Sequence, residues 1–488
     1  MKLTFAVLVT TSISITTIAA PLRADLASDV NAVLADKLLA KATVGVEIVA
    51  LGDTPETSKV LLRRGSDKPL IPASNLKVIT TAAALDKLGS SFRFETKLVR
   101  KGDDLAIIGD GDPTLGDSDL LRKVGWSSTT LFEAWAASLV KSGVTSVRDL
   151  YVDDSVFDEH FVHDNWPADQ RHLRYVAGVG GLNFNVNCLD FYFTASGGNL
   201  SYRSDPSTTF ATVQNFAKPG ESALHLDMTN TEPDGRLVRM RGTFPGGSAA
   251  VSVTVDDPSM YAGTVLADTL KAHGVQVTGT VQRNRSIRAT LTDTPTANAW
   301  QVIDRTTTPI AIAIGRANKD SNNLYAESLC KRLGFEVSNG EPGSWENGTA
   351  AIESYLGSLK IPADQYSLDD GCGLSRMNTI SAGAISAVLQ HMYFGPNRQV
   401  YVDSMAVAGI DGTLDGRFRG TDLQGRVFAK SGFINNVSSL SGYWRGQDGQ
   451  WYAFSILMNG IPNKSNSSIK PLQERIVRAA DELTSRKK

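Results

Sequence analysis

The residues of this chain best suited to chemistry are a serine and a lysine three positions apart. Ser74 and Lys77 lie at the start of the apolar stretch 74–85, and on a helix this spacing places both side chains on one face. In a dry site, desolvation and neighbouring cations can hold the lysine neutral, so that it can take the serine proton. The pair therefore predicts a serine nucleophile with a lysine as its general base.

The Ser-x-x-Lys spacing alone is weak evidence, because it also begins at Ser138, Ser328, Ser467 and Ser485. Only Ser74 lies at the expected N-terminus of a helix that is apolar on nearly all sides. Unpaired N–H groups and the helix dipole favour developing negative charge there. Ser74 is accordingly the candidate nucleophile.

A second motif supplies polar groups for such a site. Ser321 and Asn323 belong to the only Ser-x-Asn sequence of the chain, in a polar break before a predicted helix. Both side chains could face a cleft from that position. The alternative is a helix N-cap, a role that Ser and Asn often take.

A third motif, Lys430-Ser431-Gly432, follows an apolar run and precedes Phe433. The flanking residues predict an edge strand, on which Gly432 lets a ligand approach the backbone. A second Lys-Ser-Gly, at residues 141–143, closes a predicted helix and is typical of a C-cap.

In this order, the three motifs resemble the active-site motifs shared by penicillin-binding proteins and serine β-lactamases. Residues 78–320 separate Lys77 from Ser321, whereas β-lactamases place these motifs far closer together. The long separation resembles the low-molecular-mass class C penicillin-binding proteins, the D-alanyl-D-alanine carboxypeptidase/endopeptidase family, whose extra domains are inserted there.

Four more segments strengthen the resemblance. Residues 109–115 resemble the Gly-rich Asp-Pro-Thr-Leu segment of the family. Residues 370–378 resemble its Asp-Gly-Ser-Gly-Leu-Ser-Arg-x-Asn segment, with Cys372 in place of the first Ser. Residues 409–414 and 440–443 also match, so the resemblance covers essentially the whole chain after its leader.

The resemblance implies roles for the first two motifs. Ser74 would attack the carbonyl of the penultimate D-Ala, and Lys77 would accept its proton. Ser321 would relay that proton to the leaving D-Ala amine. Asn323 would orient Lys77 and the substrate amide.

The third motif is implied to bind the substrate. Lys430 and Ser431 would face the terminal carboxylate, and the N–H groups of Ser74 and Phe433 would form the oxyanion hole. One such donor is typically worth about 3 kcal/mol. Water would then hydrolyse the acyl-enzyme. The resemblance implies no cofactor and no metal.

Two positions depart from the family pattern. Ser431 replaces the commoner Thr, which keeps the hydroxyl. Phe433 replaces the small hydroxyl residue that usually follows the Gly, so one carboxylate-binding hydroxyl is lost while the backbone N–H remains. We therefore expect weaker recognition of a free D-Ala terminus, on which cleavage of a cross-link depends less.

The expected fold class is α/β (α+β), with a penicillin-recognising, β-lactamase-like catalytic domain. Its antiparallel sheet, flanked by helices, is expected to combine residues 25–95 and 296–488. Residues 96–295 contain short alternating segments and turn signals, which predict a β-rich insertion of one or two subdomains, with two nested ones favoured.

The spacing of apolar residues along the chain predicts the individual helices and strands. Helices are expected at 26–39, 74–85 with its end at Gly89, 261–273, 324–333 with its end at Gly334, 350–359, 381–392 and 469–483. Strands are expected at 44–51, 59–64, 236–241, 249–255, 275–281, 438–445 and 450–458.

The composition and the N-terminal residues narrow the possible functions. The chain of 488 residues is 42% hydrophobic with a net charge of -2, which indicates a globular protein and argues against a nucleic-acid partner. Residues 1–24 are typical of a secretory signal peptide, with cleavage preferred after Ala24 and an uncleaved anchor as the alternative. We expect a periplasmic protein whose partners are peptidoglycan and β-lactam antibiotics, and peripheral membrane contact stays open.

Several other interpretations compete with this one. His160, His163 and His172 stand among acidic residues, where a solvated loop is favoured over a metal site. Cys372 as a thiol nucleophile has no His nearby in sequence, and no Gly-x-Ser-x-Gly elbow supports a Ser-His-Asp hydrolase. A serine β-lactamase and an inactive cell-wall-binding scaffold remain the rival functions.

Two groups of residues receive no catalytic role. Asp370, Arg376 and Asp411 lie in the matching segments and are interpreted as residues that support the catalytic side chains or have a structural role, not as catalytic residues. Whether the three cysteines of the chain pair stays open; they are Cys188, Cys330 and Cys372.

Overall fold

The protein is described by a computed structural model that covers residues 22–231, 235–292, 298–447, 449–462 and 466–485. Most of the predicted signal peptide therefore lies outside the described residues. Helix α1 (Leu22–Leu34) is the first element, so cleavage after Ala24 would fall in its first turn. Within the described ranges, no helix has the length and apolar character that a membrane span requires.

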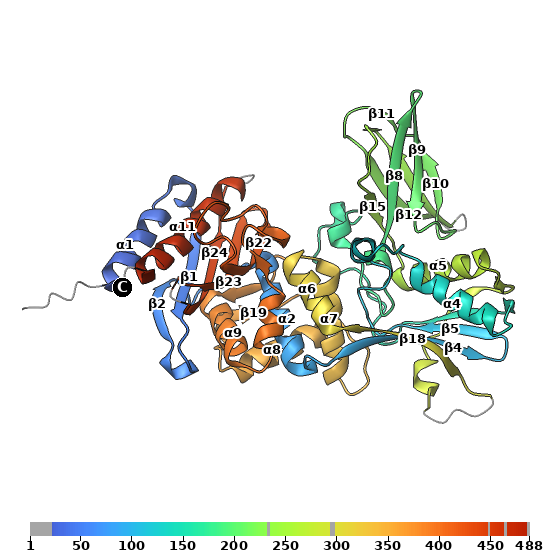
Figure 1. The fold of residues 1–488 in the computed structure, drawn as a ribbon, viewed down its shortest axis with the longest axis horizontal. Helices are drawn as coiled ribbons and strands as arrows, with labels where there is room; N and C mark the ends of the chain where they lie inside the picture. Colours follow the sequence, from blue (N-terminus) through green and yellow to red (C-terminus); the bar gives the residue numbers. More distant parts are fainter. Residues whose placement is uncertain (1–21, 232–234, 293–297, 448, 463–465, 486–488) are drawn as a thin grey trace, which may run out of the picture.

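One sheet combines the two ends of the chain (Figure 1). Its strands are antiparallel, and their order is β2 (Lys59–Arg64), β1 (Thr43–Ala50), β24 (Trp451–Asn459), β23 (Val437–Arg445), β22 (Val427–Ile434) and β21 (Ala406–Val407). The pairing of β1 with β24 runs from Thr43–Asn459 to Ala50–Tyr452. The predicted pairing of the first two strands is confirmed.

Helices cover both faces of this sheet. On one face, α1 packs against α11 (Asn466–Ser485), and apolar side chains such as Val30, Ile48, Ile456 and Ile476 share one buried cluster. The other face is covered by α9 (Ala382–Phe394), beyond which lie α2 (Leu76–Leu88), α6 (Ile310–Lys319), α7 (Asn323–Val337), α8 (Trp345–Ser358) and α10 (Arg398–Asp403).

Helix α2 lies at the centre of this layer. Its residues 76–85 are all buried, which agrees with a sequence that is apolar on nearly all sides of the helix. It ends at Gly89, whose φ of 82° is a conformation that glycine adopts without strain. The 3-10 turn η3 (Ala73–Asn75) precedes it, so Ser74 lies just before the first residue of the α-helix.

Two predicted helix ends are wrong. The helix expected at 26–39 ends at Leu34, and a separate 3-10 turn, η1 (Lys37–Leu39), follows it. Helix α7 continues past Gly334 to Val337. A Cβ at Gly334 would lie 2.0 Å from Asn347 Oδ1 and 2.7 Å from Gly348 N. This glycine therefore allows α7 and α8 to approach closely and does not cap the helix.

The middle of the chain forms a second lobe on a mixed five-stranded sheet. The strand order is β17 (Val281–Arg283), β7 (Leu150–Asp153), β5 (Asp104–Ile108), β4 (Arg93–Lys101) and β18 (Gln301–Pro309). Helices α4 (Thr130–Lys141) and α5 (Pro258–Ala272) pack against each other in this lobe. The predicted strand 275–281 is instead interrupted, with β16 (Gln276–Val277) in a separate pairing.

Short β-sheets project from this lobe (Figure 1). One sheet joins β15 (Val251–Thr254), β8 (Cys188–Ser196) and β9 (Asn199–Asp205), and another joins β10 (Thr212–Asn215), β13 (Gly235–Arg241) and β12 (His225–Thr231). Strand β18 lies within the range 296–488 that the sequence predicts for the catalytic domain, but it pairs with β4. We propose that the inserted region extends from Arg93 to Pro309, with the short sheets as a subdomain nested inside it.

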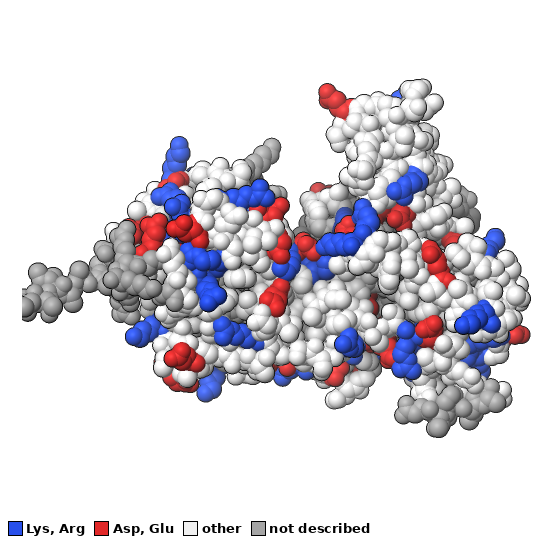
Figure 2. All heavy atoms as spheres, in the orientation of Figure 1, with Lys and Arg blue, Asp and Glu red and all other residues white. Residues whose placement is uncertain are grey.

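The surface carries both signs of charge. Figure 2 shows basic and acidic side chains interspersed over the face in view. This distribution agrees with the nearly balanced composition of 49 Lys and Arg against 51 Asp and Glu.

Candidate active site

The site is built around the turn that carries Ser74. Ala73 in this turn has a φ of 48°, an unusual conformation for a residue other than glycine. This turn packs closely against a second turn, which contains Gly373. A Cβ at Gly373 would lie only 1.9 Å from Ala73 O. The main chain directly before Ser74 is therefore held by this close contact.

Lys77 lies one helical turn after Ser74 and is fully buried. Its Nζ lies 3.1 Å from Ser74 Oγ, 2.7 Å from Asn323 Oδ1 and 2.8 Å from the carbonyl oxygen of Cys372. A neutral amine has two N–H bonds and one lone pair. The Asn323 and Cys372 oxygens can accept the two N–H bonds, which leaves the lone pair for the Ser74 hydroxyl.

Burial lowers the pKa of Lys77, because desolvation disfavours the ammonium form. The carboxylates of Glu327 and Asp370 oppose this effect by attracting the positive charge. The arrangement therefore favours a lysine that can be neutral when it receives a proton.

Lys430 occupies the opposite side of the site, on β22. Its Nζ donates hydrogen bonds to Ser321 Oγ at 2.8 Å and to the carbonyl of Ser431 at 2.6 Å. Burial, and then the charge of Lys77, hold the pKa of Lys430 well below its ordinary value. Ser321 itself has a φ of 58° in the break between α6 and α7, so its backbone is held in a left-handed conformation.

Strand β22 lies directly against the Ser74 turn. A Cβ at Gly432 would lie 2.3 Å from Ser439 Oγ and 3.0 Å from both Asn75 N and Pro72 O. Asn75 Nδ2 also donates to the Lys430 carbonyl at 3.1 Å. Only a glycine leaves room for this approach.

The predicted edge strand lies one place in from the edge. Strand β21 pairs with Phe428 and Ala429 of β22. Among the described strands, β22 has no neighbour on that side from Lys430 to Ile434, so this part of the strand is open to the site.

A cavity of about 690 Å³ opens at Ser74. Its walls come from the catalytic motifs, the 373–376 turn, the end of β22 and the inserted region. The lining residues are Ser74, Pro167, Gln170, Leu173, Tyr175, Ser321, Asn323, Gly373, Leu374, Arg376, Phe433, Ile434 and Asn435.

The sequence motifs did not point to the wall from the inserted region. Tyr175 lines the cavity, and its carbonyl accepts a 2.8 Å hydrogen bond from Asn323 Nδ2. Arg376, interpreted from sequence as a supporting or structural residue, also lines the cavity and donates to the carbonyl of Asn435 at 2.8 Å. No residue type or spacing in the sequence indicates that segment 167–175 returns to the site.

Ser431 turns its hydroxyl toward the segment 409–414. Its Oγ donates to Thr413 Oγ1 at 2.9 Å. Asp411 of the same segment accepts the N–H of Val407 at 2.7 Å and pairs with Lys319, which agrees with a structural role.

The predicted solvated histidine loop is wrong for the residues at its centre. His163 is only 8% exposed, and its Nε2 lies 2.8 Å from the carbonyl oxygen of Asp369. Its ring packs on Trp345 at a centroid distance of 4.9 Å. Asp153 and Asp154 are also buried. These contacts pack the segment against the catalytic part of the chain. Aromatic rings and hydrogen bonds therefore surround its central residues in place of water.

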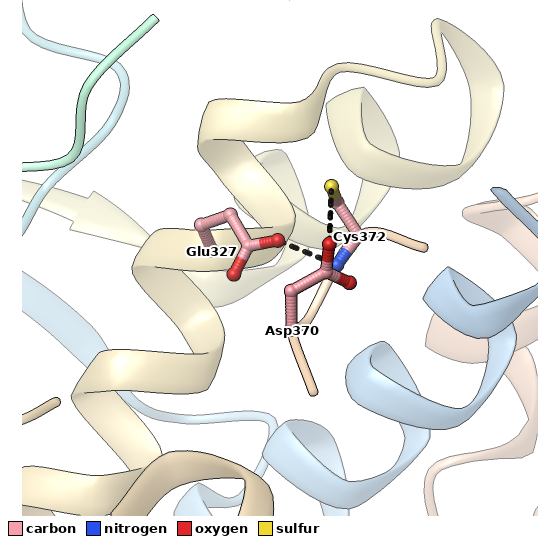
Figure 3. A group of neighbouring side chains, drawn as sticks. All are labelled: Glu327, Asp370 and Cys372. Carbon is pink, nitrogen blue, oxygen red and sulfur yellow. Dashed lines mark hydrogen bonds between the residues drawn. The ribbon is translucent and has the colours of Figure 1, made fainter. Parts of the chain in front are cut away.

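Glu327, Asp370 and Cys372 form a buried group whose candidate ligand atoms lie within 4.8 Å of one another (Figure 3). Each carboxylate already accepts several N–H donors, including the main chain of Gly371 and Gly373. Burial also raises the pKa of the Cys372 thiol well above its ordinary value. A protonated thiol and occupied carboxylates do not suit a metal ion.

The structure also answers whether the cysteines pair and whether Cys372 could be a nucleophile. All three cysteines are buried and free, so none forms a disulfide. A fully buried, protonated thiol at Cys372 is a poor nucleophile.

Comparison with known proteins agrees with the family resemblance of the sequence motifs. A family model described as the D-Ala-D-Ala carboxypeptidase 3 (S13) family matches residues 26–483. A D-alanyl-D-alanine carboxypeptidase of Actinomadura sp. (strain R39) is 34% identical over 462 residues, which cover 89% of this chain and 81% of that protein.

Solved structures share the fold. The crystal structure of penicillin binding protein 4 (dacB) from Haemophilus influenzae has a TM-score of 0.73 at 22% identity and covers 94% of this chain and 98% of its own. The same protein is also known complexed with a β-lactam. The Bd0816 predatory endopeptidase of Bdellovibrio bacteriovorus has a TM-score of 0.51 at 17% identity and covers 91% of this chain and 94% of its own.

Proposed function

The chain belongs to the D-Ala-D-Ala carboxypeptidase 3 (S13) family and is a serine-type hydrolase of that class, and from this premise we propose that its acyl-enzyme forms on Ser74. The observation that supports the assignment is the position of Lys77. Its Nζ lies 3.1 Å from Ser74 Oγ while two other oxygens take its N–H bonds.

In the proposed acylation, Ser74 Oγ attacks the carbonyl carbon of the penultimate D-Ala and gives its proton to Lys77. A C–O bond forms, and the tetrahedral intermediate then expels the D-Ala amine as the C–N bond breaks. Ser321, which accepts a hydrogen bond from Lys430, gives its hydroxyl proton to that amine and takes the proton from Lys77 in exchange. Water later cleaves the ester and restores Ser74.

The proposed oxyanion hole uses two main-chain N–H groups, those of Ser74 and Phe433. The close packing of Gly432 on the Ser74 turn supports this choice, because it places the two segments side by side. Donors fixed in this way stabilise the negative oxygen without reorganising during the reaction.

The proposed substrates are peptidoglycan stem peptides that end in D-Ala-D-Ala or are cross-linked through D-Ala. Phe433 lines the cavity and is 41% exposed, so an apolar ring stands where a hydroxyl would bind the terminal carboxylate. This favours the endopeptidase reaction over release of a free D-Ala. The proposal includes inhibition by β-lactams, export by the leader and a periplasmic location.

The test is intact and peptide mass spectrometry after incubation of the protein with benzylpenicillin. We expect a persistent adduct on the peptide that contains Ser74, and its loss in Ser74→Ala. Ser138→Ala is the matched control, because Ser138 begins another Ser-x-x-Lys on the exposed side of α4. Intact antibiotic without an adduct would indicate a binding scaffold, and consumed antibiotic without an adduct would indicate a β-lactamase.

A further inference from the structure

A main-chain carbonyl holds the catalytic lysine. The Cys372 oxygen lies 2.8 Å from Lys77 Nζ and accepts one of its N–H bonds. This carbonyl belongs to the turn Gly371–Gly373, in which two of three residues are glycines. Because glycine restricts the main chain least, side chains from other elements must fix the carbonyl in place.

Glu327 fixes this turn from α7, about one helical turn after Asn323. Its Oε1 accepts the N–H of Cys372 at 2.7 Å, and its Oε2 accepts the N–H of Gly371 at 2.9 Å. Trp345 Nε1 also donates to Oε2 at 2.7 Å. Every one of these partners is a donor, so the group they suit is a carboxylate and not an amide.

We propose that Glu327 is a positioning residue for acylation: its carboxylate holds the Cys372 carbonyl against Lys77 and so keeps the lone pair of Lys77 directed at Ser74. The inference rests on the proposed function, in which Lys77 is the base. Glu327 is buried and does not line the cavity, so it acts through the turn and through its charge. Figure 3 shows the side chain directed at the main chain of Cys372.

The charge of Glu327 also acts on the base. The carboxylate raises the pKa of Lys77 against the lowering by burial. Burial raises the pKa of Glu327 itself to about 7, so the carboxylate is charged above neutral pH. The other titratable groups around Glu327 come from α2, α7 and the turn; they are Lys77, Cys330, Lys331, Asp370 and Cys372.

Glu327→Gln tests both effects. An amide in either orientation directs its NH₂ group at one or more N–H donors, so at least one contact to the turn or to Trp345 is lost. We expect acylation by benzylpenicillin to slow by about a hundredfold, the cost typical of a small misplacement of a catalytic group. The rise of the acylation rate with pH should move to lower pH, because one of the charges that raise the pKa of Lys77 is gone.

Glu327→Asp distinguishes the effect of the carboxylate's position from the effect of its charge. It also tests the inference if the Glu327→Gln variant does not fold. It keeps the negative charge but shortens the reach, so the rate should fall while the pH profile stays in place. Glu346→Gln on the exposed side of α8 is the matched control and should acylate like the wild type.

Wild-type rates and an unmoved profile in folded Glu327→Gln would overturn the inference. A slower rate with an unmoved profile in that variant would also overturn it, because a loosened core has that effect. A wild-type rate in Glu327→Asp would do the same. If the wild type itself formed no adduct on Ser74, the proposed function would fail instead, so the two failures are distinguishable.

Discussion

The amine nitrogen of Lys430 lies 2.8 Å from the hydroxyl oxygen of Ser321, and this hydrogen bond joins strand β22 to the break before α7. Lys77 forms the corresponding bond to Asn323 at 2.7 Å. Each lysine therefore holds one residue of the Ser-x-Asn motif, and each is buried. The two bonds therefore join the three sequence motifs into one group of side chains.

Lys430→Met should slow acylation by benzylpenicillin by about a hundredfold or more, the usual range for a lost proton-transfer partner. The methionine keeps most of the length of the side chain but cannot donate to Ser321. Stopped-flow measurement of adduct formation checks this, with Lys141→Met in the other Lys-Ser-Gly as the control. Rates within twofold of the wild type would contradict the role of Lys430.

Acylation should accelerate as the pH rises from acidic values. Lys77 must be neutral to accept the Ser74 proton, and burial lowers its pKa from the ordinary value. The rate should therefore rise as pH increases through that lowered pKa and then reach a plateau. A rate independent of pH across a range in which circular dichroism shows a folded protein would argue against Lys77 as the base.

Gly432→Ala should destabilise the protein by about 1–3 kcal/mol, the usual cost of overpacking, and should reduce acylation strongly. The new Cβ would meet Ser439 Oγ at 2.3 Å, and the main chain of Asn75 and Pro72 at 3.0 Å, so β22 must move away from the Ser74 turn. Thermal unfolding and adduct formation measure the two effects.

Gly416→Ala is the control for this prediction, because a Cβ there meets nothing within 4 Å. It should change neither the melting temperature nor the rate. An unaltered acylation rate in Gly432→Ala would mean that β22 does not need its close approach to the turn.

Phe433→Thr should increase hydrolysis of small peptides that end in free D-Ala-D-Ala. The introduced hydroxyl would stand at the cavity wall, where the Phe433 ring now lies, and could bind the terminal carboxylate. Release of D-Ala from a synthetic peptide and cleavage of cross-linked dimers should be compared in both proteins. Unchanged release of D-Ala would refute the proposed effect of Phe433.

Trp166→Phe should slow acylation, because Trp166 connects the inserted region to the active site. Trp166 Nε1 donates a 2.9 Å hydrogen bond to the buried Asp370, which in turn fixes the N–H groups of Gly373 and Ser375. Removing this donor should cost about 1–3 kcal/mol of stability and slow acylation. Trp126→Phe, at a position 57% exposed, should have no effect, and equal behaviour of the two variants would contradict the link.

The sequence by itself determined most of the local elements and the motifs that carry the candidate residues. Apolar residues on all sides of 76–85 require a buried helix, and Gly89 ends it, so the position of Ser74 before that helix follows from local rules. The same holds for β1, β2, β23 and β24, whose patterns predict strands within one or two residues of the observed ends. Gly334 shows the limit, because a glycine that would end an isolated helix instead permits α7 to pack on α8.

Only the tertiary structure decided what surrounds the motifs. The wall formed by Tyr175, the burial of His163 and the support of the Cys372 carbonyl by Glu327 all join residues far apart in the chain. The contact between Glu327 and Cys372 depends on how α7 packs against the turn after the fold is complete. A buried charge is stable only with partners, and one sequence gives residue types and spacing but not which distant N–H groups will become those partners.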